Sequence, residues 1–200
     1  MTDSRRTDTK RRLINTALKE IQQKGYQQIS IREIAKQNQL TAAAVYKHFG
    51  GKNDLMVEVL KCASQEFETY IDNYLAEHPA INSYQQLIFL GEANVRWNED
   101  EAMLADFLFF SPVAAQAVKQ SMDEQDSPYV SLNRNLEIII GFVEENQLNI
   151  DPKELFIQLW SFIQGYTTLI KNHICSYDRG FIEATLNTLI RGLTMNEEES

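Results

Sequence analysis

The sequence has little of what disulfide-rich, metal-binding or membrane-spanning proteins need. It holds two cysteines, Cys62 and Cys175, far apart and outside any Cys-x-x-Cys pair, which argues against a disulfide framework and favours a reducing compartment. Its three histidines, His48, His78 and His173, form no HExxH or related pattern, so no metal site is predicted. No apolar run approaches the length of about 18 residues that crosses a bilayer, and no apolar segment follows the charged N-terminus as in a signal peptide. We therefore expect a cytoplasmic protein without membrane contact.

The strict alternation of apolar and polar residues that marks β-strands is also missing. Apolar residues instead recur three and four positions apart, as in Leu13, Ala17 and Ile21, which is typical of helices. The pattern predicts an all-α protein. The expected helices cover residues 10–24, a short segment from Ile31, 41–49, a long helix from Asn53 or Asp54 to just before Pro79, then 83–98, 100–110, 112–124, 127–147, 152–175 and 177–193.

Helix-capping residues stand where these helices should begin. Ser30 and Glu33 have the spacing of a capping box, in which each side chain accepts the other residue's backbone N–H. Gly25 is placed to end the first helix in a left-handed conformation. The remaining expected N-caps are Asn53 or Asp54, Thr41, Ser111, Asp126 and Asp151, the last three followed within two residues by a proline.

Charge is strongly segregated along the chain. The formal net charge is −9, yet residues 1–52 carry 11 Lys and Arg against 4 Asp and Glu, while residues 53–200 carry 8 against 24. The two parts therefore differ in sign, +7 against −16. A basic N-terminal part is typical of contact with a polyanion such as DNA; the alternative is a solvated basic tail.

The first fifty residues read as three short helices, the second and third joined by a tight turn, which describes a helix-turn-helix. In that motif the third helix lies in the major groove. The run Ala42–Ala44 would let its backbone approach the bases and offer methyl groups to thymine. Tyr46, Lys47 and His48 follow on the next turn, where longer side chains reach phosphates or bases. Ala43 is also a candidate for packing between the second and third helices, since close packing demands small groups.

Residues 9–60 resemble the N-terminal domain of the tetracycline-repressor (TetR) family of bacterial transcription regulators. The similarity rests on KGYQQISIREIA from Lys24 to Ala35, on the LTAAAVYKHF segment, and on GGKNDL through Leu55. The family's helix-turn-helix falls at about residues 30–49. One departure is visible: Gln39 stands where the family usually has glycine in the turn, so it must adopt a positive φ or alter the turn.

The resemblance implies a set of DNA contacts. By position, Ser30, Tyr46, His48 and Lys52 resemble phosphate-contacting residues. Ala42, Ala44 and Lys47 occupy positions that usually face bases, and Thr41 begins the same helix. Lys52 would act at the start of the fourth helix, where free N–H groups also attract phosphate.

Residues 53–200 show no shared motif, and the resemblance implies a helical ligand-binding and dimerisation domain there, after a DNA-binding domain of residues 1–52. The last two helices carry apolar stripes that are expected to pack within the subunit and against a partner: Leu155, Leu159, Phe162, Tyr166, Leu169 and His173, then Ile182, Leu186, Leu189 and Leu193. Central aromatic residues are candidates to line a ligand pocket, with plain core as the alternative: Trp97, Phe107, Phe110, Tyr129, Trp160 and Tyr166.

Together these features predict a sequence-specific DNA-binding transcriptional regulator, a ligand-responsive repressor acting as a homodimer. Its expected partners are a palindromic double-stranded DNA operator, a second copy of itself and a small-molecule effector. An enzyme or cofactor-binding protein built on a helical bundle is the alternative. It would require a convergent set of titratable or metal-ligating groups on the long helices, which the sequence does not show. No enzymatic activity, metal or cofactor is therefore expected.

Overall fold

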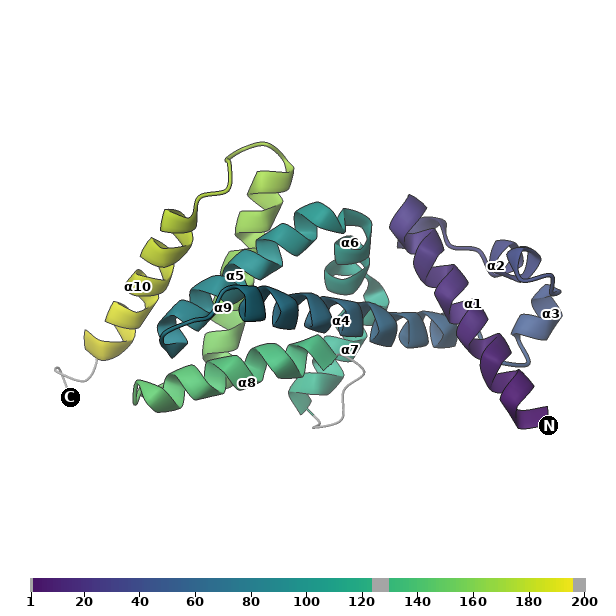
Figure 1. Cartoon of the computed structure of the whole chain (residues 1–200), viewed down its shortest axis with the longest axis horizontal. Helices are drawn as coiled ribbons and strands as arrows, with labels where there is room; N and C mark the ends of the chain where they lie inside the picture. The colour runs from purple at the N-terminus through teal and green to yellow at the C-terminus, as the bar shows by residue number, and fades with distance from the viewer. Residues whose placement is uncertain (1, 124–129, 196–200) are drawn as a thin grey trace. The chain divides into compact units, whose positions relative to one another are not determined.

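The computed structural model describes residues 2–123 and 130–195, and within them the chain forms helices and no strand. Figure 1 traces these helices along the chain. They are α1 (Thr2–Lys24), the 3-10 helix η1 (Tyr26–Gln28), α2 (Ile31–Gln37), α3 (Ala42–Val45), α4 (Lys52–Glu77), α5 (Ser83–Asp100), α6 (Ala102–Phe110), α7 (Pro112–Asp123), α8 (Val130–Glu145), α9 (Pro152–Lys171) and α10 (Arg179–Met195). The all-α prediction is confirmed.

The chain divides into two compact units. The first unit comprises Met1–Phe67 and Glu101–Leu132, and the second comprises Glu68–Asp100 and Asn133–Ser200. Helix α4 thus contributes residues to both units. The predicted division into a DNA-binding domain of residues 1–52 and a second domain of residues 53–200 differs from this division by contacts, and as a division by function it stays a prediction.

The first unit is built around the apolar face of α1. Leu13, Ala17 and Ile21 are fully buried at four-residue spacing, as the periodicity predicts. Helix α1 contacts α2, η1 and α6, so this face is covered from several directions. Full burial of each leucine or isoleucine side chain contributes about 1.5–3 kcal/mol to folding. Gly25 ends α1 at φ 83°, and its N–H donates to the carbonyl of Ile21 at 2.8 Å, so the predicted glycine stop is confirmed.

The second unit is centred on α5. All residues from Leu87 to Val95 are buried, because α5 contacts both α9 and α10. Gly91 permits this close packing: a Cβ at that position would lie 3.3 Å from Ile163 Cδ1 and 3.4 Å from Ile182 Cγ2. A larger residue would push α5 away from its two neighbours.

Most of the predicted caps are present. Thr41 Oγ1 accepts the N–H of Ala44 at 3.2 Å, Ser111 Oγ that of Ala114 at 3.1 Å, and Asp151 Oδ1 that of Lys153 at 2.8 Å. The predicted capping box is wrong, because Ser30 makes no side-chain cap bond. The predicted cap at Asn53 or Asp54 is also wrong, because α4 begins at Lys52 and both residues lie inside it. Asp126 lies outside the described residues.

No single helix in the described part of the chain is long and apolar enough to cross a membrane. Helices α6 and α7 reach that length and composition only as a pair, and they bend by 52° where they meet.

Candidate nucleic-acid interface and internal cavity

The turn between α2 and α3 is a Schellman motif centred on Gln39. Gln39 has φ 59°, and the N–H groups of Gln39 and Leu40 donate to the carbonyls of Lys36 (3.0 Å) and Ala35 (2.8 Å). These two bonds satisfy carbonyls that the end of α2 leaves free. The first of the two predicted outcomes for Gln39, a positive φ at the usual glycine position, is therefore confirmed.

Replacing Gln39 with glycine should stabilise the protein. A non-glycine residue in the left-handed region costs about 1 kcal/mol, and a gain of that size raises Tm by about 2–4 °C in a chain of this length. Thermal unfolding followed by circular dichroism measures the change. Gln39→Ala keeps the Cβ and is the matched control, for which no gain is expected. A glycine variant that melts at or below the parent would show that the turn carries no strain.

Polar side chains fasten this turn to α1. The buried Asn38 donates from Nδ2 to Thr16 Oγ1 and to the carbonyl of Ile34, each at 2.9 Å. Gln37 Nε2 donates to Glu20 Oε1 at 2.7 Å. Hydrogen bonds from Lys24 and Gln37 lower the pKa of Glu20, so this carboxylate stays ionised as their acceptor. The second helix and the turn are thereby held in a fixed position on α1.

Helix α3 presents its alanines differently from the prediction. Ala43 is exposed, whereas Ala42 and Ala44 are half-buried. Ala43 therefore does not pack between α2 and α3, and that candidate role is wrong. The buried side chain of this helix is Val45, with 0% exposure. Because the buried Val45 turns one side of α3 to the core, the exposed Ala43 lies on the side that could enter a DNA groove.

The third helix is also shorter than predicted. Its α-helical part ends at Val45, and the chain continues through turns in which the N–H groups of Lys47 and His48 donate to carbonyls three residues earlier, at 3.2 and 2.9 Å. Tyr46 is 53% exposed and Lys47 is exposed. His48 is half-buried, and its Nδ1 is buried without a hydrogen-bond partner. Only the other ring nitrogen, Nε2, is thus left for an outside contact.

Ser30 and Lys52 are both exposed, at the starts of α2 and α4. Lys52 Nζ donates to the carbonyl of Ile29 at 2.7 Å, which places the ammonium group at the segment immediately before Ser30. The hydroxyl of Ser30 is not used as a cap. Two predicted phosphate-contacting groups are therefore gathered at one edge of the first unit.

Arg6 is a residue of this surface that motif reasoning missed. Its Nη2 donates to the carbonyl of Lys47 at 3.5 Å, which brings the basic N-terminal segment to the end of α3. The available signal was the density of Lys and Arg in residues 1–12, which shows charge but not the surface it covers. Lys10 of the same segment is held within the unit, with Nζ 3.2 Å from Glu58 and 5.7 Å from the ring centre of Phe49.

The second unit contains a cavity of about 60 Å³ between α5, α8, α9 and α10. Every described residue that lines it is uncharged, and the polar lining residues are Asn94 and Asn135. Asn94 Nδ2 donates to the carbonyl of Leu90 at 2.8 Å. Asn135 Oδ1 is buried without a partner.

The described residues of the predicted pocket set are divided between the two units. Trp160 lines the cavity, whereas Trp97 and Tyr166 belong to the same unit and are buried away from it. Phe107 and Phe110 belong to the first unit; Phe107 lines an open groove of about 400 Å³ there, and Phe110 is 53% exposed. Tyr129 lies outside the described residues. Asn94 and Asn135 were missed, although an asparagine within an apolar helix is itself a signal.

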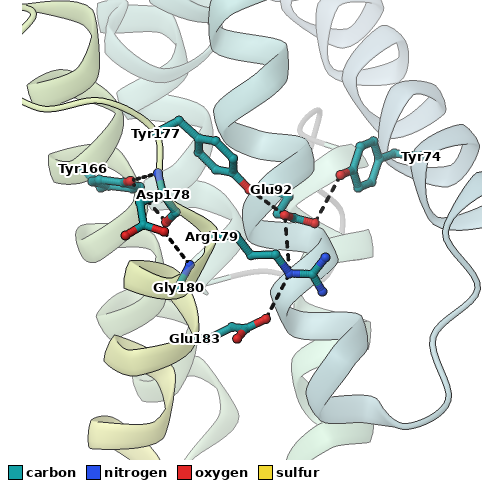
Figure 2. A network of polar contacts seen from close by, with 8 residues as sticks. All are labelled: Tyr74, Glu92, Tyr166, Tyr177, Asp178, Arg179, Gly180 and Glu183. Carbon is teal, nitrogen blue, oxygen red and sulfur yellow. Dashed lines mark hydrogen bonds and ion pairs between the residues drawn. The ribbon is translucent and has the colours of Figure 1, made fainter.

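A buried carboxylate, Glu92, organises the polar contacts of α5 (Figure 2). It is 4% exposed and accepts hydrogen bonds from Tyr177 at 2.5 Å and Tyr74 at 3.2 Å. Arg179 Nε lies 3.7 Å from Glu92 and 2.9 Å from Glu183. Burial first, then the hydrogen bond to Glu92, raises the pKa of Tyr177, so its hydroxyl stays protonated as a donor. This cluster ties the segment before α10 to α5.

A three-helix domain with a helix-turn-helix and an exposed third helix, joined to a helical second unit, defines a class of bacterial regulator. Residues 13–59 match the family model described as bacterial regulatory proteins, tetR family. The N-terminal part of the chain is therefore similar to the tetR-family domain, and the whole chain shares its fold with a solved structure assigned to that family. The predicted resemblance is confirmed.

Solved structures with this fold share little sequence with the chain. A protein assigned to the tetR family of transcription regulators from Shewanella sp. PV-4 has 18% identity and a TM-score of 0.66, over 90% of this chain and 95% of that one. The fatty acid degradation regulator FadR from Bacillus halodurans has 18% identity and a TM-score of 0.60, over 90% and 93%. RolR in complex with resorcinol has 14% identity and a TM-score of 0.66, over 93% and 89%. No curated protein matches the sequence.

Proposed function

We propose that this protein is a sequence-specific DNA-binding transcriptional regulator that acts as a cytoplasmic homodimer and represses until a small molecule binds its second unit. The observation that carries the proposal is the exposed end of the helix-turn-helix. Ala43 of α3 is exposed, as are Tyr46 and Lys47 immediately after this helix, while Val45 is the buried residue of α3. A recognition helix needs such a surface, because its side chains must reach base edges and phosphates.

In this proposal the groove-facing residues divide by chemistry. Lys47 donates to base edges. The methyl groups of Ala42 and Ala44, which flank the exposed Ala43, contact thymine methyl groups. Phosphates are held by the donors around this helix, namely Ser30, Thr41, Tyr46, His48, Lys52 and Arg6. Phosphate contacts fix the register of the protein on the duplex, and base contacts select the sequence.

The dimer is proposed to form through α9 and α10. Ile157, Ser161, Gly165 and Leu169 recur every four residues along α9 and are all exposed, with Ile157 at 49% and Leu169 at 41%. Phe181 of α10 is 47% exposed. The small residues allow close approach of a second helix, and the large apolar ones supply area that a partner would cover. Part of the predicted stripe faces inward, as expected: Leu155, Tyr166, Ile182 and Leu186 are buried within the unit.

Ligand response is proposed for the cavity of the second unit. RolR is described in complex with the ligand resorcinol, so a protein of this fold holds a small aromatic molecule. The cavity of about 60 Å³ is smaller than the roughly 300–1,000 Å³ of small-molecule pockets. A ligand must therefore widen it, and it shifts the population of dimer geometries only by binding the wider form better.

Salt dependence of DNA binding tests the proposal. DNA fragments selected with the purified protein should bind as palindromes at two chains per duplex. Their affinity should fall by about 10³–10⁵ between 50 and 200 mM salt if six to ten phosphates are contacted, as fluorescence anisotropy measures.

Lys52→Ala should weaken binding to all sequences alike and reduce the salt slope by about one. Lys119→Ala, which removes an exposed lysine of α7, is the matched control and should change neither. An affinity that stays constant over this salt range would overturn the proposal, since it would exclude phosphate contacts.

A further inference from the structure

We infer that the cavity of the second unit binds a small uncharged molecule that donates a hydrogen bond to Asn135. The regulatory meaning of this inference rests on the proposed function, whereas the binding itself does not. The starting point is the unpaired acceptor: Asn135 Oδ1 is buried and has no partner, and Asn135 lines the cavity. A buried polar atom without a partner destabilises the fold, so a ligand that donates a hydrogen bond to Asn135 Oδ1 would remove this cost.

The other polar lining residue does not compete for this role. Asn94 Nδ2 donates to the carbonyl of Leu90 at 2.8 Å, and no atom of Asn94 is among the described buried polar atoms without a partner, whereas Asn135 Oδ1 is. The rest of the described lining is apolar, with Leu159 and Trp160 among its members. The bound molecule should therefore be mostly apolar and carry one O–H or N–H group.

Charged ligands do not fit this lining. A cation needs a carboxylate or several carbonyl oxygens, and an anion needs a cation or free N–H groups, because burying an unpaired charge is very costly. The nearest carboxylate along α5 is Glu92, next to Gly91, and it is already engaged by Tyr74, Tyr177 and Arg179 (Figure 2). No charged residue is present among the described lining residues, so neutrality is the expected property of the ligand.

Widening the cavity must displace part of the packing between the helices that line it, α5, α8, α9 and α10. Gly91 sits on the cavity lining, and a Cβ placed there would already be 3.3 Å from Ile163 and 3.4 Å from Ile182. Because α5, α9 and α10 pack this closely, a ring-sized ligand must displace side chains or helices that line the cavity. Since α9 and α10 form the proposed dimer face, a ligand in this cavity would act directly on the helices that set the dimer geometry.

Matched aromatic probes test the inference. Phenol and toluene have nearly the same shape and differ by a hydroxyl in place of a methyl group. Isothermal titration calorimetry at pH 7 should give phenol about tenfold higher affinity than toluene, the factor expected for one hydrogen bond worth about 1.4 kcal/mol. Benzoate and benzylammonium should not bind. Equal affinities for phenol and toluene, no binding of either, or tighter binding of benzoate or benzylammonium would each overturn the inference.

Variants locate the site and the hydrogen bond. Asn135→Leu keeps the bulk and removes the acceptor, so the preference for phenol over toluene should disappear while toluene still binds. Asn133→Leu changes an exposed asparagine of the same helix and should keep the preference. The chain has two tryptophans, Trp97 and Trp160, whose fluorescence can be excited selectively. Phenol should quench this fluorescence in the parent. In Trp160→Phe, which retains only Trp97, phenol should not quench it. A preference that survives in Asn135→Leu, or quenching that survives in Trp160→Phe, would place the ligand elsewhere.

DNA binding is measured separately on the same preparations. Salt-sensitive DNA binding without phenol binding would retain the proposed DNA-binding function and overturn this inference. Phenol binding with the predicted preference, but without DNA binding, would retain this inference and overturn the proposed DNA-binding function.

Discussion

Replacing Ala43 with glutamate should lower affinity for the selected DNA by at least about 100-fold, or about 2.7 kcal/mol, without lowering Tm. Ala43 is the exposed alanine of α3, and its neighbour Val45 holds the helix in the core. A glutamate there would place a carboxylate among phosphates and fill the space that the groove needs. Juxtaposing like charges across an interface costs several kcal/mol. Fluorescence anisotropy gives the affinity and circular dichroism the Tm.

Two further variants separate the causes. Ala43→Gln has almost the same bulk without the charge, so it should retain part of the affinity. Ala115→Glu adds the same charge at an exposed alanine of α7 in the same unit and should bind DNA nearly as the parent does. Parent-like affinity in Ala43→Glu would mean that α3 does not enter the groove. Ala44 is a poorer probe, because it is half-buried and a glutamate there would also disturb packing.

The helices could be predicted because their causes are local. Four-residue periodicity in α1 and side-chain caps such as Thr41 and Asp151 involve contacts between residues at most a few positions apart. The positive φ of Gln39 was foreseeable for the same reason, since a tight turn at that position requires it.

The predictions that were wrong, the orientation of the α3 alanines and the capping box at Ser30, also have a physical reason. A short helix such as α3 spans about one turn, so its periodicity cannot tell which of three consecutive alanines faces outward. Ser30 has the composition of a capping box but not its geometry. The propensity rule names a residue type that can cap, whereas the actual bond depends on the rotamer that the surroundings select.

The cavity and the Glu92 cluster could not be predicted at all. Glu92 and Tyr177 are 85 positions apart, and periodicity shows which face of a helix is buried but not which helix covers it. The pocket residues were chosen for being aromatic, yet the unpaired atom of Asn135 distinguishes the cavity. Polar residues at apolar helix positions would have been the better guide, because a buried amide needs either a partner or a ligand.

Replacing the buried Glu92 with alanine should strongly destabilise the protein. The variant removes the acceptor of both tyrosine hydroxyls and the partner of Arg179 at 3.7 Å. Leaving buried donors unpaired costs about 1–3 kcal/mol each, and breaking a buried ion pair costs a similar amount or more. We discount the arginine contact, because its side chain is 44% exposed. A total loss of about 3 kcal/mol lowers Tm by about 6–12 °C in a chain of this length.

Thermal unfolding of two conservative variants separates the contributions of the charge and of the hydrogen bonds to the stability lost in Glu92→Ala. Glu92→Gln keeps an oxygen that can accept from Tyr177 or Tyr74 and loses the charge, so its Tm should lie between those of the parent and Glu92→Ala. Tyr177→Phe removes one donor and leaves the carboxylate with Tyr74 and Arg179, for an expected loss of about 1 kcal/mol. If Glu92→Ala melts within about 2 °C of the parent, then water satisfies both hydroxyls and the cluster does not hold the segment before α10 to α5. If Glu92→Gln is as unstable as Glu92→Ala, the charge rather than the hydrogen bonds stabilises this part of the fold.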